Sequence, residues 1–160
     1  MTPGAGSKIV VGVDGSESSL GALRWAVRQA EMTKDDLLVL TVWSYPERPA
    51  PFGMVPELPL PDDPMAEVRR RLDDVVDAAA GRKPSIAVRA EVVEGRAATA
   101  LVEAARDAEL LVVGSRGLGA IAGMLLGSVS EHCVRHAASP VVVVRSTDDA
   151  ARVSRGSRQP

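Results

Sequence analysis

The chain has 160 residues, of which 46% are hydrophobic and 2% aromatic, and its formal net charge is −2 at pH 7. This length suits one domain with an aliphatic core, and the slightly acidic balance argues against a nucleic-acid binder, which normally carries a basic stripe. The single cysteine, Cys133, excludes an intrachain disulfide. Because there is also no membrane-length apolar run and no signal-like start, we expect a cytoplasmic protein without a membrane partner.

The first part of the chain predicts a strand, a helix and a second strand. Residues 1–7 are small and polar, so we expect a flexible N-terminus. Lys8 to Val13 is a short β-branched run, typical of a strand that is buried on both faces. Ser16 is a candidate N-cap for a helix that ends near Thr33, and Asp36 to Trp43 is the second strand.

The segment from Tyr45 to Pro61 contains six prolines within seventeen residues. Proline removes a backbone donor and restricts φ, so neither a helix nor a central strand is expected there. We expect a long loop, which is either a solvent-exposed crossover or a lid over a ligand or a partner surface.

The second part of the chain continues the alternation of helices and strands. Three further helices are expected: one begins at Pro64 behind a capping Asp62 or Asp63, one is opened by Gly95 and Arg96, and one includes the stretch from Ser130 to Ala137. Three further strands are expected, at Ile86–Val93, Leu110–Val113 and Val141–Val144. Residues 146–160 show no apolar periodicity and are predicted to form a disordered basic tail.

This alternation predicts an α/β protein with an open, doubly wound, Rossmann-like sheet of five parallel strands. Right-handed crossovers place the helices on both faces of such a sheet. Ligands of these sheets bind at the carboxyl ends of the strands. Asp14 ends the first predicted strand and Gly114 ends the fourth, so both are candidate site residues.

The stretch from Gly114 to Ser130, GSRGLGAIAGMLLGSVS, predicts an anion site. Two residues separate Gly114 from Gly117, and nine separate Gly117 from Gly127, which precedes Ser128. Glycines let backbone amides approach a ligand closely. The N-terminus of the following helix adds unpaired N–H groups and a partial positive charge, which favours a phosphate.

The spacing Gly-x2-Gly-x9-Gly-Ser resembles the nucleotide-binding signature of the universal stress protein family, in its ATP-binding branch. The stretch from Val11 to Ser16 and the Ser139-Pro140 pair before four valines are also similar to that family, and the resemblance covers residues 8–145. It implies the strand order 3-2-1-4-5, ATP accompanied by Mg2+, and a homodimer through the edge strand Val141–Val144.

The resemblance and the loop together define a set of candidate nucleotide-binding residues. The resemblance implies that Asp14 lies near the ribose or a metal and that the backbone of Val42 reads adenine; a helix cap and a core valine are the plainer interpretations. Arg116 either pairs with phosphate or faces water, and the hydroxyls of Ser128 and Ser130 are expected to donate to phosphate. The full set is Gly12, Val13, Asp14, Val42, Val113, Gly114, Ser115, Arg116, Gly117, Gly127, Ser128, Val129 and Ser130.

Other combinations of residues in the chain are weaker signals. His132 and His136 stand four apart on a predicted helix with Cys133 between them, a spacing that can bind a metal. No third and fourth ligand is evident, so we expect no protein-held metal. Residues 117–122 fit the dinucleotide fingerprint, but the strand after them runs into Arg145 instead of an acidic residue.

The sequence favours a nucleotide-responsive regulator in the stress response. No recognised motif places a general base beside the glycine-rich loop, so we expect ATP binding with slow or absent hydrolysis and no catalytic residue. We expect Tyr45–Pro61 and Leu118–Leu126 to become ordered over ATP. Two other classes stay open: a slow ATPase, and a module that binds cyclic AMP or another adenosine ligand.

Overall fold

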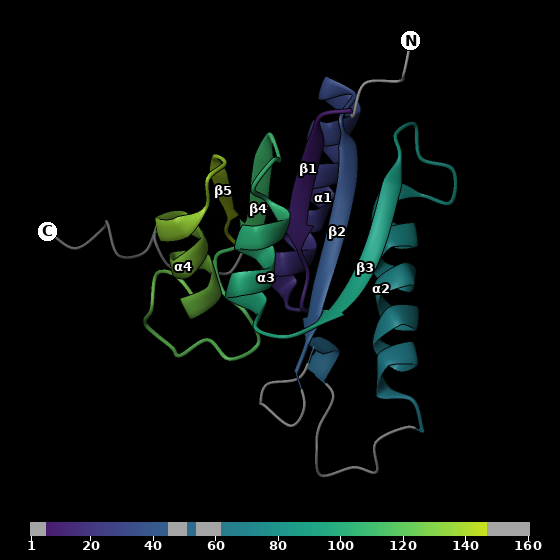
Figure 1. Cartoon of the computed structure of the whole chain (residues 1–160). Helices are drawn as coiled ribbons and strands as arrows, with labels where there is room; N and C mark the ends of the chain where they lie inside the picture. Colours follow the sequence, from purple (N-terminus) through teal and green to yellow (C-terminus); the bar gives the residue numbers. More distant parts are fainter. Residues whose placement is uncertain (1–5, 45–50, 54–61, 147–160) are drawn as a thin grey trace, which may run out of the picture.

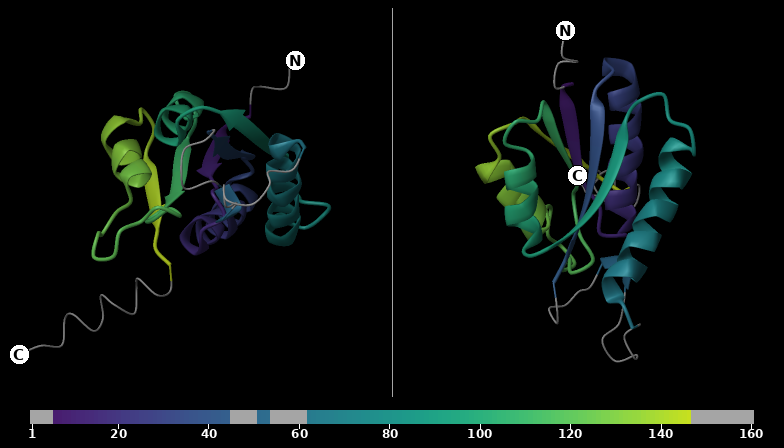
Figure 2. Two further views of the ribbon diagram at one scale, coloured as in Figure 1. Left: turned by 90° about the horizontal axis from the view of Figure 1, so that it is seen from below. Right: turned by 45° about the vertical axis from the view of Figure 1, so that its right-hand side comes forward.

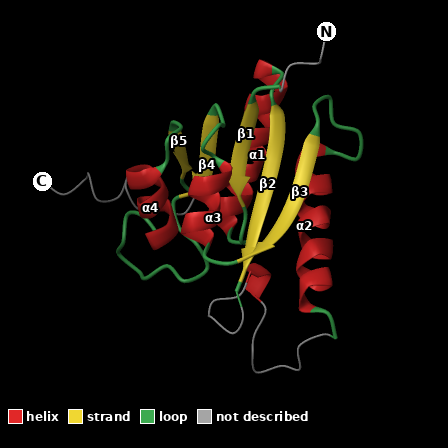
Figure 3. Ribbon diagram, viewed as in Figure 1, coloured by secondary structure: helices red, strands yellow, loops and turns green. Residues whose placement is uncertain are grey.

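The computed structural model describes residues 6–44, 51–53 and 62–146. Strands and helices alternate along the chain (Figures 1 and 3), in the order β1 (Lys8–Gly12), α1 (Glu17–Thr33), β2 (Asp36–Trp43), α2 (Pro64–Ala80), β3 (Val88–Glu94), α3 (Ala97–Ala104), β4 (Leu110–Gly114), α4 (Ser128–His136) and β5 (Val141–Val144). One turn of 3-10 helix, η1 (Pro51–Gly53), lies between β2 and α2.

The five strands form one parallel sheet in the order β3-β2-β1-β4-β5. Seen from below the sheet, α1 and α2 lie on one face and α3 and α4 on the other (Figure 2). The predicted fold class and strand order are therefore confirmed. Because β1 lies between β2 and β4, the chain segments that leave these three strands meet at one edge of the sheet.

The core consists of two aliphatic layers, one on each face of the sheet. Val11 belongs to the layer under α1 and α2, whereas its neighbour Val10 belongs to the layer under α3 and α4. Both valines are completely buried, as expected for a parallel strand that is covered on both sides. Helix α1 contributes a continuous apolar stripe to the first layer, formed by Ala22, Leu23, Ala26, Val27 and Ala30.

The helices on the two faces begin differently. The side chain of Ser16 accepts a hydrogen bond from Ser19 N and caps α1. Asp63 caps α2 by accepting from Ala66 N at 3.0 Å, and Pro64 occupies the first turn, so these two predicted caps are confirmed. By contrast, α3 and α4 begin without a side-chain cap, which leaves N–H groups of their first turns available.

Several predicted boundaries were wrong by one or two residues. β1 ends at Gly12 rather than Val13, although Val13 N still donates to Leu40 O. β3 begins at Val88 rather than Ile86, and β4 includes Gly114. The stretch from Ser130 to Ala137, predicted to lie within the fourth helix, falls in α4 (Ser128–His136) except for Ala137, which is its C-cap.

The predictions for the chain ends and the proline-rich segment fall mostly outside the described residues. Ser7, predicted to be flexible, accepts a hydrogen bond from Asp36 N at the start of β2. The turn η1 departs from the prediction that no helix forms between Tyr45 and Pro61; the rest of that prediction lies in 45–50 and 54–61. Residues 1–5 and 147–160 also lie outside the described part.

No helix in the described ranges is long and apolar enough to cross a membrane.

Helix α2 depends on Val68 and Leu72, which are both completely buried. We predict that Leu72→Ala lowers the free energy of unfolding by about 2–5 kcal/mol, because it removes apolar contacts and leaves a cavity. The neighbouring exposed substitution Asp73→Ala should change it by less than about 0.5 kcal/mol. Urea denaturation of both variants measures the change in the free energy of unfolding. Equal changes in the two variants would contradict the conclusion that α2 depends on its buried residue Leu72.

Candidate functional site

A cleft opens where β1, β2 and β4 end, between the glycine-rich loop and the N-termini of α3 and α4. Its main part has a volume of about 680 Å³, and an adjoining narrow part of about 80 Å³ reaches toward Leu40 and Leu101. All candidate residues from the sequence line one part or the other, except Ser115. Ser115 is buried beneath the loop, where its N–H donates to Val144 O and its carbonyl accepts from Gly127 N.

Asp14 joins the turn after β1 to the glycine-rich loop. Its Oδ1 accepts from Ser16 N at 2.9 Å, and its Oδ2 accepts from Leu118 N at 3.0 Å. Its backbone N–H donates to Ser19 Oγ at 3.3 Å. Asp14 is not the helix cap itself, because Ser16 is the N-cap of α1, but it supports the turn before that cap and also lines the cleft.

A side chain would collide with a neighbour at Gly114 and Gly117 and would be crowded at Gly127. A Cβ on Gly114 would stand 2.7 Å from Ser19 N, and a Cβ on Gly117 would stand 2.8 Å from Asp14 Oδ2. At Gly127 it would stand 3.3 Å from Gly117 N. The spacing of the motif thus has an architectural cause, since it lets the loop pass close to α1, to Asp14 and to itself.

Two polar side chains of the Gly114–Ser130 stretch make hydrogen bonds within the protein. The hydroxyl of Ser130 donates to Gly114 O, so its proton is not directed at a ligand. The Arg116 guanidinium donates to Met124 O at 2.6 Å and thereby holds the loop. Ser128 is exposed on the wall of the cleft, as a ligand-binding hydroxyl requires.

Two helix N-termini line the cleft. Gly127, the N-cap of α4, has no side chain to satisfy the first N–H groups, and Arg96 at the same position of α3 makes no side-chain cap. Residues of both first turns form part of the cleft wall. Because each N-terminus carries a partial positive charge, the two together favour an anion.

The contribution of α3 was missed from the sequence, although Gly95 and Arg96 directly follow a predicted strand. A glycine and an arginine directly after a strand, at its carboxyl end, could have indicated that the start of the next helix contributes to the site. Arg96 and His132 line the same main part of the cleft and were not among the candidates.

The backbone of Val42 faces the cleft. The carbonyl of Leu40 accepts from Val13 N, directly after β1, whereas that of Trp43 accepts from Gly95 N on the β3 side. Since successive residues of a strand direct their backbone groups to opposite sides, the N–H and C=O of Val42 point to the β1 side. β1 has already ended there, so this donor and acceptor lie at the cleft wall.

The His132, Cys133 and His136 group does not form a metal site in the described part of the chain, where no three His, Cys, Asp or Glu side chains are close enough to hold an ion. The two imidazole rings lie 4.3 Å apart, centroid to centroid. Burial raises the pKa of the Cys133 thiol to about 11, so this residue is a protonated member of the core at neutral pH.

The sequence profile of the Universal stress protein family matches residues 7–145. The chain belongs to this family. A universal stress protein of Mycobacterium tuberculosis is 38% identical over 147 residues, which are 88% of this chain and 48% of the relative. One from Mycolicibacterium smegmatis is 34% identical over 152 residues, 92% of this chain and 51% of that protein. The chain thus spans about half the length of these curated relatives.

A solved universal stress protein in complex with cAMP is 33% identical to this chain, with a TM-score of 0.60. The match covers 89% of this chain and 99% of that one, so the fold described above extends over the whole of that protein.

Gly114 provides a test of the loop's packing in this universal stress protein. Gly114→Ala should lower the free energy of unfolding by about 1–3 kcal/mol, because the new methyl group collides with the backbone of α1. Gly21→Ala is the matched control: its Cβ meets only Val144 Cγ1 at 3.7 Å and an arginine side chain. Because alanine favours a helix interior, Gly21→Ala should raise stability by about 0.5–1 kcal/mol. Thermal unfolding measures both changes in stability. A change of the same sign in the two variants would contradict this account of Gly114.

Proposed function

We propose that this domain binds adenine nucleotides in the cleft, with ATP as its preferred ligand, and acts as a nucleotide-responsive regulator. The observation that carries the proposal is the meeting of two helix N-termini without side-chain caps in one cleft, opposite the backbone edge of Val42. A volume of about 680 Å³ is within the usual range for small-molecule sites. The cAMP complex of a universal stress protein that is 33% identical supports the adenine-nucleotide class.

The proposed arrangement places each part of the nucleotide against a different wall. The N–H and C=O of Val42 suit the hydrogen-bonding edge of adenine, and Leu40, Leu101 and Val113 give the narrow part an apolar lining. The phosphates would lie at the first turn of α4, where the amides of residues 128–130 and the Ser128 hydroxyl are donors. The ribose would then lie between these walls, near Asp14 and Gly117.

The preference for ATP over cyclic AMP rests on the number of anion-binding groups. A triphosphate carries more negative charge than a cyclic monophosphate, and the cleft offers the N-termini of both α3 and α4 together with the exposed Arg96. The Gly-x2-Gly-x9-Gly-Ser spacing supports the same choice through its resemblance to the ATP-binding branch. We propose that Leu118–Leu126, part of which lines the cleft, closes over the bound nucleotide.

Mg2+ enters the proposal only as the partner of the triphosphate. Asp14 is the sole carboxylate among the described residues that line the cleft, and both of its oxygens accept backbone N–H groups. These residues alone do not build a magnesium site, so phosphate oxygens and water would supply the remaining ligands. For the same reason Asp14 is poorly placed as a general base, and we propose binding without efficient hydrolysis.

We also propose that the protein forms a homodimer through β5. This strand is at the edge of the sheet, and its four valines are only half-buried. An apolar edge with free backbone groups is a template for pairing with a second copy. Sedimentation at micromolar concentration tests this proposal, and a monomer would reject it. The cytoplasm remains the proposed location.

The binding site is tested by titration calorimetry with ATP, ADP and cyclic AMP. We expect Gly117→Glu to weaken ATP binding roughly 100-fold or more, because it places a carboxylate beside Asp14 and the phosphates. Ala78→Glu adds the same charge to an exposed position of α2, on the other face of the sheet, and should leave binding unchanged.

Three results would reject parts of this function. Absence of nucleotide binding by the wild-type domain, or unaltered binding by Gly117→Glu, would exclude the cleft. Tighter binding of cyclic AMP than of ATP would favour the cyclic-nucleotide alternative. Rapid release of phosphate that is lost in Asp14→Ala would favour the ATPase.

A further inference from the structure

The turn η1 packs directly against Asp14 and Gly15. Phe52 N donates to Asp14 O at 2.7 Å, and a Cβ on Gly15 would stand 2.6 Å from Phe52 Cδ1. Gly15 adopts a φ of 88°, which keeps its Cα face open to the ring. The neighbouring Pro51 is buried and lines the main part of the cleft.

Phe52 is held in this position from two other sides. Its ring packs against the small cluster formed by Trp43 and Val68, to which Met65 also belongs. Its backbone has the left-handed values φ 57° and ψ 25°, which are uncommon for a residue with a side chain. A position of this kind persists only when the surrounding contacts determine it.

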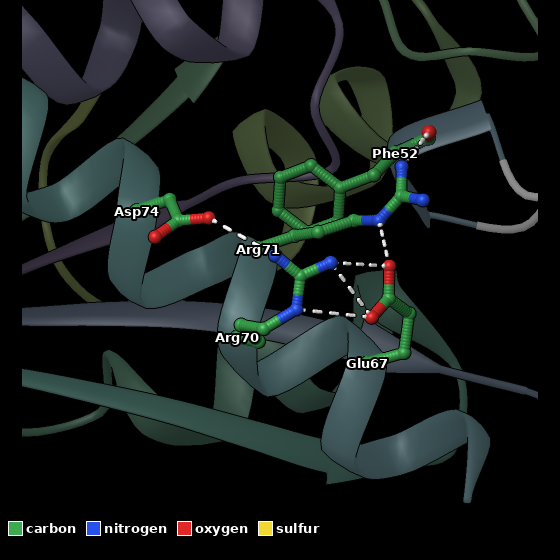
Figure 4. A network of polar contacts seen from close by, with 5 residues as sticks. All are labelled: Phe52, Glu67, Arg70, Arg71 and Asp74. Atoms are coloured by element: carbon green, nitrogen blue, oxygen red, sulfur yellow. Dashed lines mark hydrogen bonds and ion pairs between the residues drawn. The ribbon is translucent and has the colours of Figure 1, made fainter. Parts of the chain in front are cut away.

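Helix α2 supplies an outer support. Arg71 Nη1 lies 3.4 Å from Phe52 O, and its Nε donates to Glu67 Oε1 at 2.7 Å (Figure 4). Arg70 binds the same glutamate and also Asp74, and none of the contacts drawn in Figure 4 joins it to Phe52. Hydrogen bonds from Arg71 and then Arg70 lower the pKa of the Glu67 carboxyl, so Glu67 is ionised at neutral pH and keeps Arg71 in place.

We propose that Phe52 is a positioning residue for the nucleotide cleft: by fixing Asp14 from behind, it fixes the glycine-rich loop that Asp14 holds through Leu118. This inference rests on the proposed function for its ligand. The N–H of Phe52 donates to the backbone carbonyl of Asp14, and the carboxylate of Asp14 accepts from Leu118 in the loop. Asp14 therefore links Phe52 to the glycine-rich loop. Arg71 acts through Phe52 and is a second, outer positioning residue.

The coupling has a reciprocal consequence. If the contact of Phe52 with Asp14 and Gly15 raises the affinity for nucleotide, then bound nucleotide must raise the equilibrium constant for forming that contact by the same factor. Saturating ATP should therefore slow hydrogen exchange of the Phe52 amide, which donates to Asp14 O, although this amide need not touch the ligand.

The test compares Phe52→Gly with Met65→Ala. Glycine adopts the left-handed backbone without strain but removes the ring, whereas Met65→Ala removes a side chain from the same cluster without touching Asp14 or Gly15. Phe52→Gly should weaken ATP binding by roughly 2- to 30-fold and shift the amide resonances of Ser16 and Leu118, which donate to Asp14. Met65→Ala should do neither, even where it lowers the melting temperature.

Arg71→Ala and Arg70→Ala form a second matched pair, because both remove one guanidinium from Glu67. Only Arg71→Ala should weaken ATP binding and shift the Leu118 amide, and Arg71→Lys should restore part of both effects. Equal effects of the two alanine variants would reject a role for Arg71 through Phe52.

The outcomes separate this inference from the proposed function. Equal weakening by Phe52→Gly and Met65→Ala, or unchanged binding in both, overturns it. If the wild-type domain binds no nucleotide, the proposed function fails, and the resonance of Leu118 in the free protein decides the positioning role. If the Leu118 resonance shifts in Phe52→Gly but not in Met65→Ala, the positioning role is supported. If it does not shift in Phe52→Gly, the positioning role is overturned.

Discussion

The carboxylate of Asp14 is the interaction on which the cleft depends. Asp14 lies just after β1, and its carboxylate accepts one N–H group from Ser16 in the turn that starts α1 and another from Leu118 in the glycine-rich loop. The loop is therefore tied to the centre of the sheet rather than only to β4, from which it leaves. This tie acts together with the hydrogen bonds that the hydroxyls of Ser16 and Ser18 donate to Arg116 O, and these contacts fix the path of the connection between β4 and α4 past the ends of the strands.

Main-chain groups contribute to the proposed ligand contacts of the cleft, beside side chains such as those of Arg96 and Ser128. The candidate donors and acceptors are the edge of Val42 and the first turns of α3 and α4, while Arg116 and Ser130 hold the loop together instead. Glycine has two functions here, since the same lack of a side chain that exposes amides also permits the close contacts with α1 and Asp14. Backbone N–H groups that are preorganised at helix N-termini favour an anion.

Much of this arrangement was predictable from the sequence, because it follows from hydrophobic periodicity and from local capping. The valine-rich runs predicted the buried strands, and Ser16 and Asp63 predicted two helix starts. The strand order came from the family resemblance. The partners of Arg116 and Ser130 were not predictable, because each accepting carbonyl depends on the three-dimensional path of the loop. The position of Phe52 was not predictable for the same reason. A proline-rich segment shows no periodicity, and the contact between Phe52 and Gly15 joins residues that are far apart in the sequence.

The most direct test of this account is a crystal structure of the protein grown with ATP. The account predicts adenine beside the backbone of Val42 and phosphates at the first turn of α4, with the bond between Asp14 and Leu118 retained. ATP bound at another surface, or phosphates lying away from residues 127–130, would contradict it.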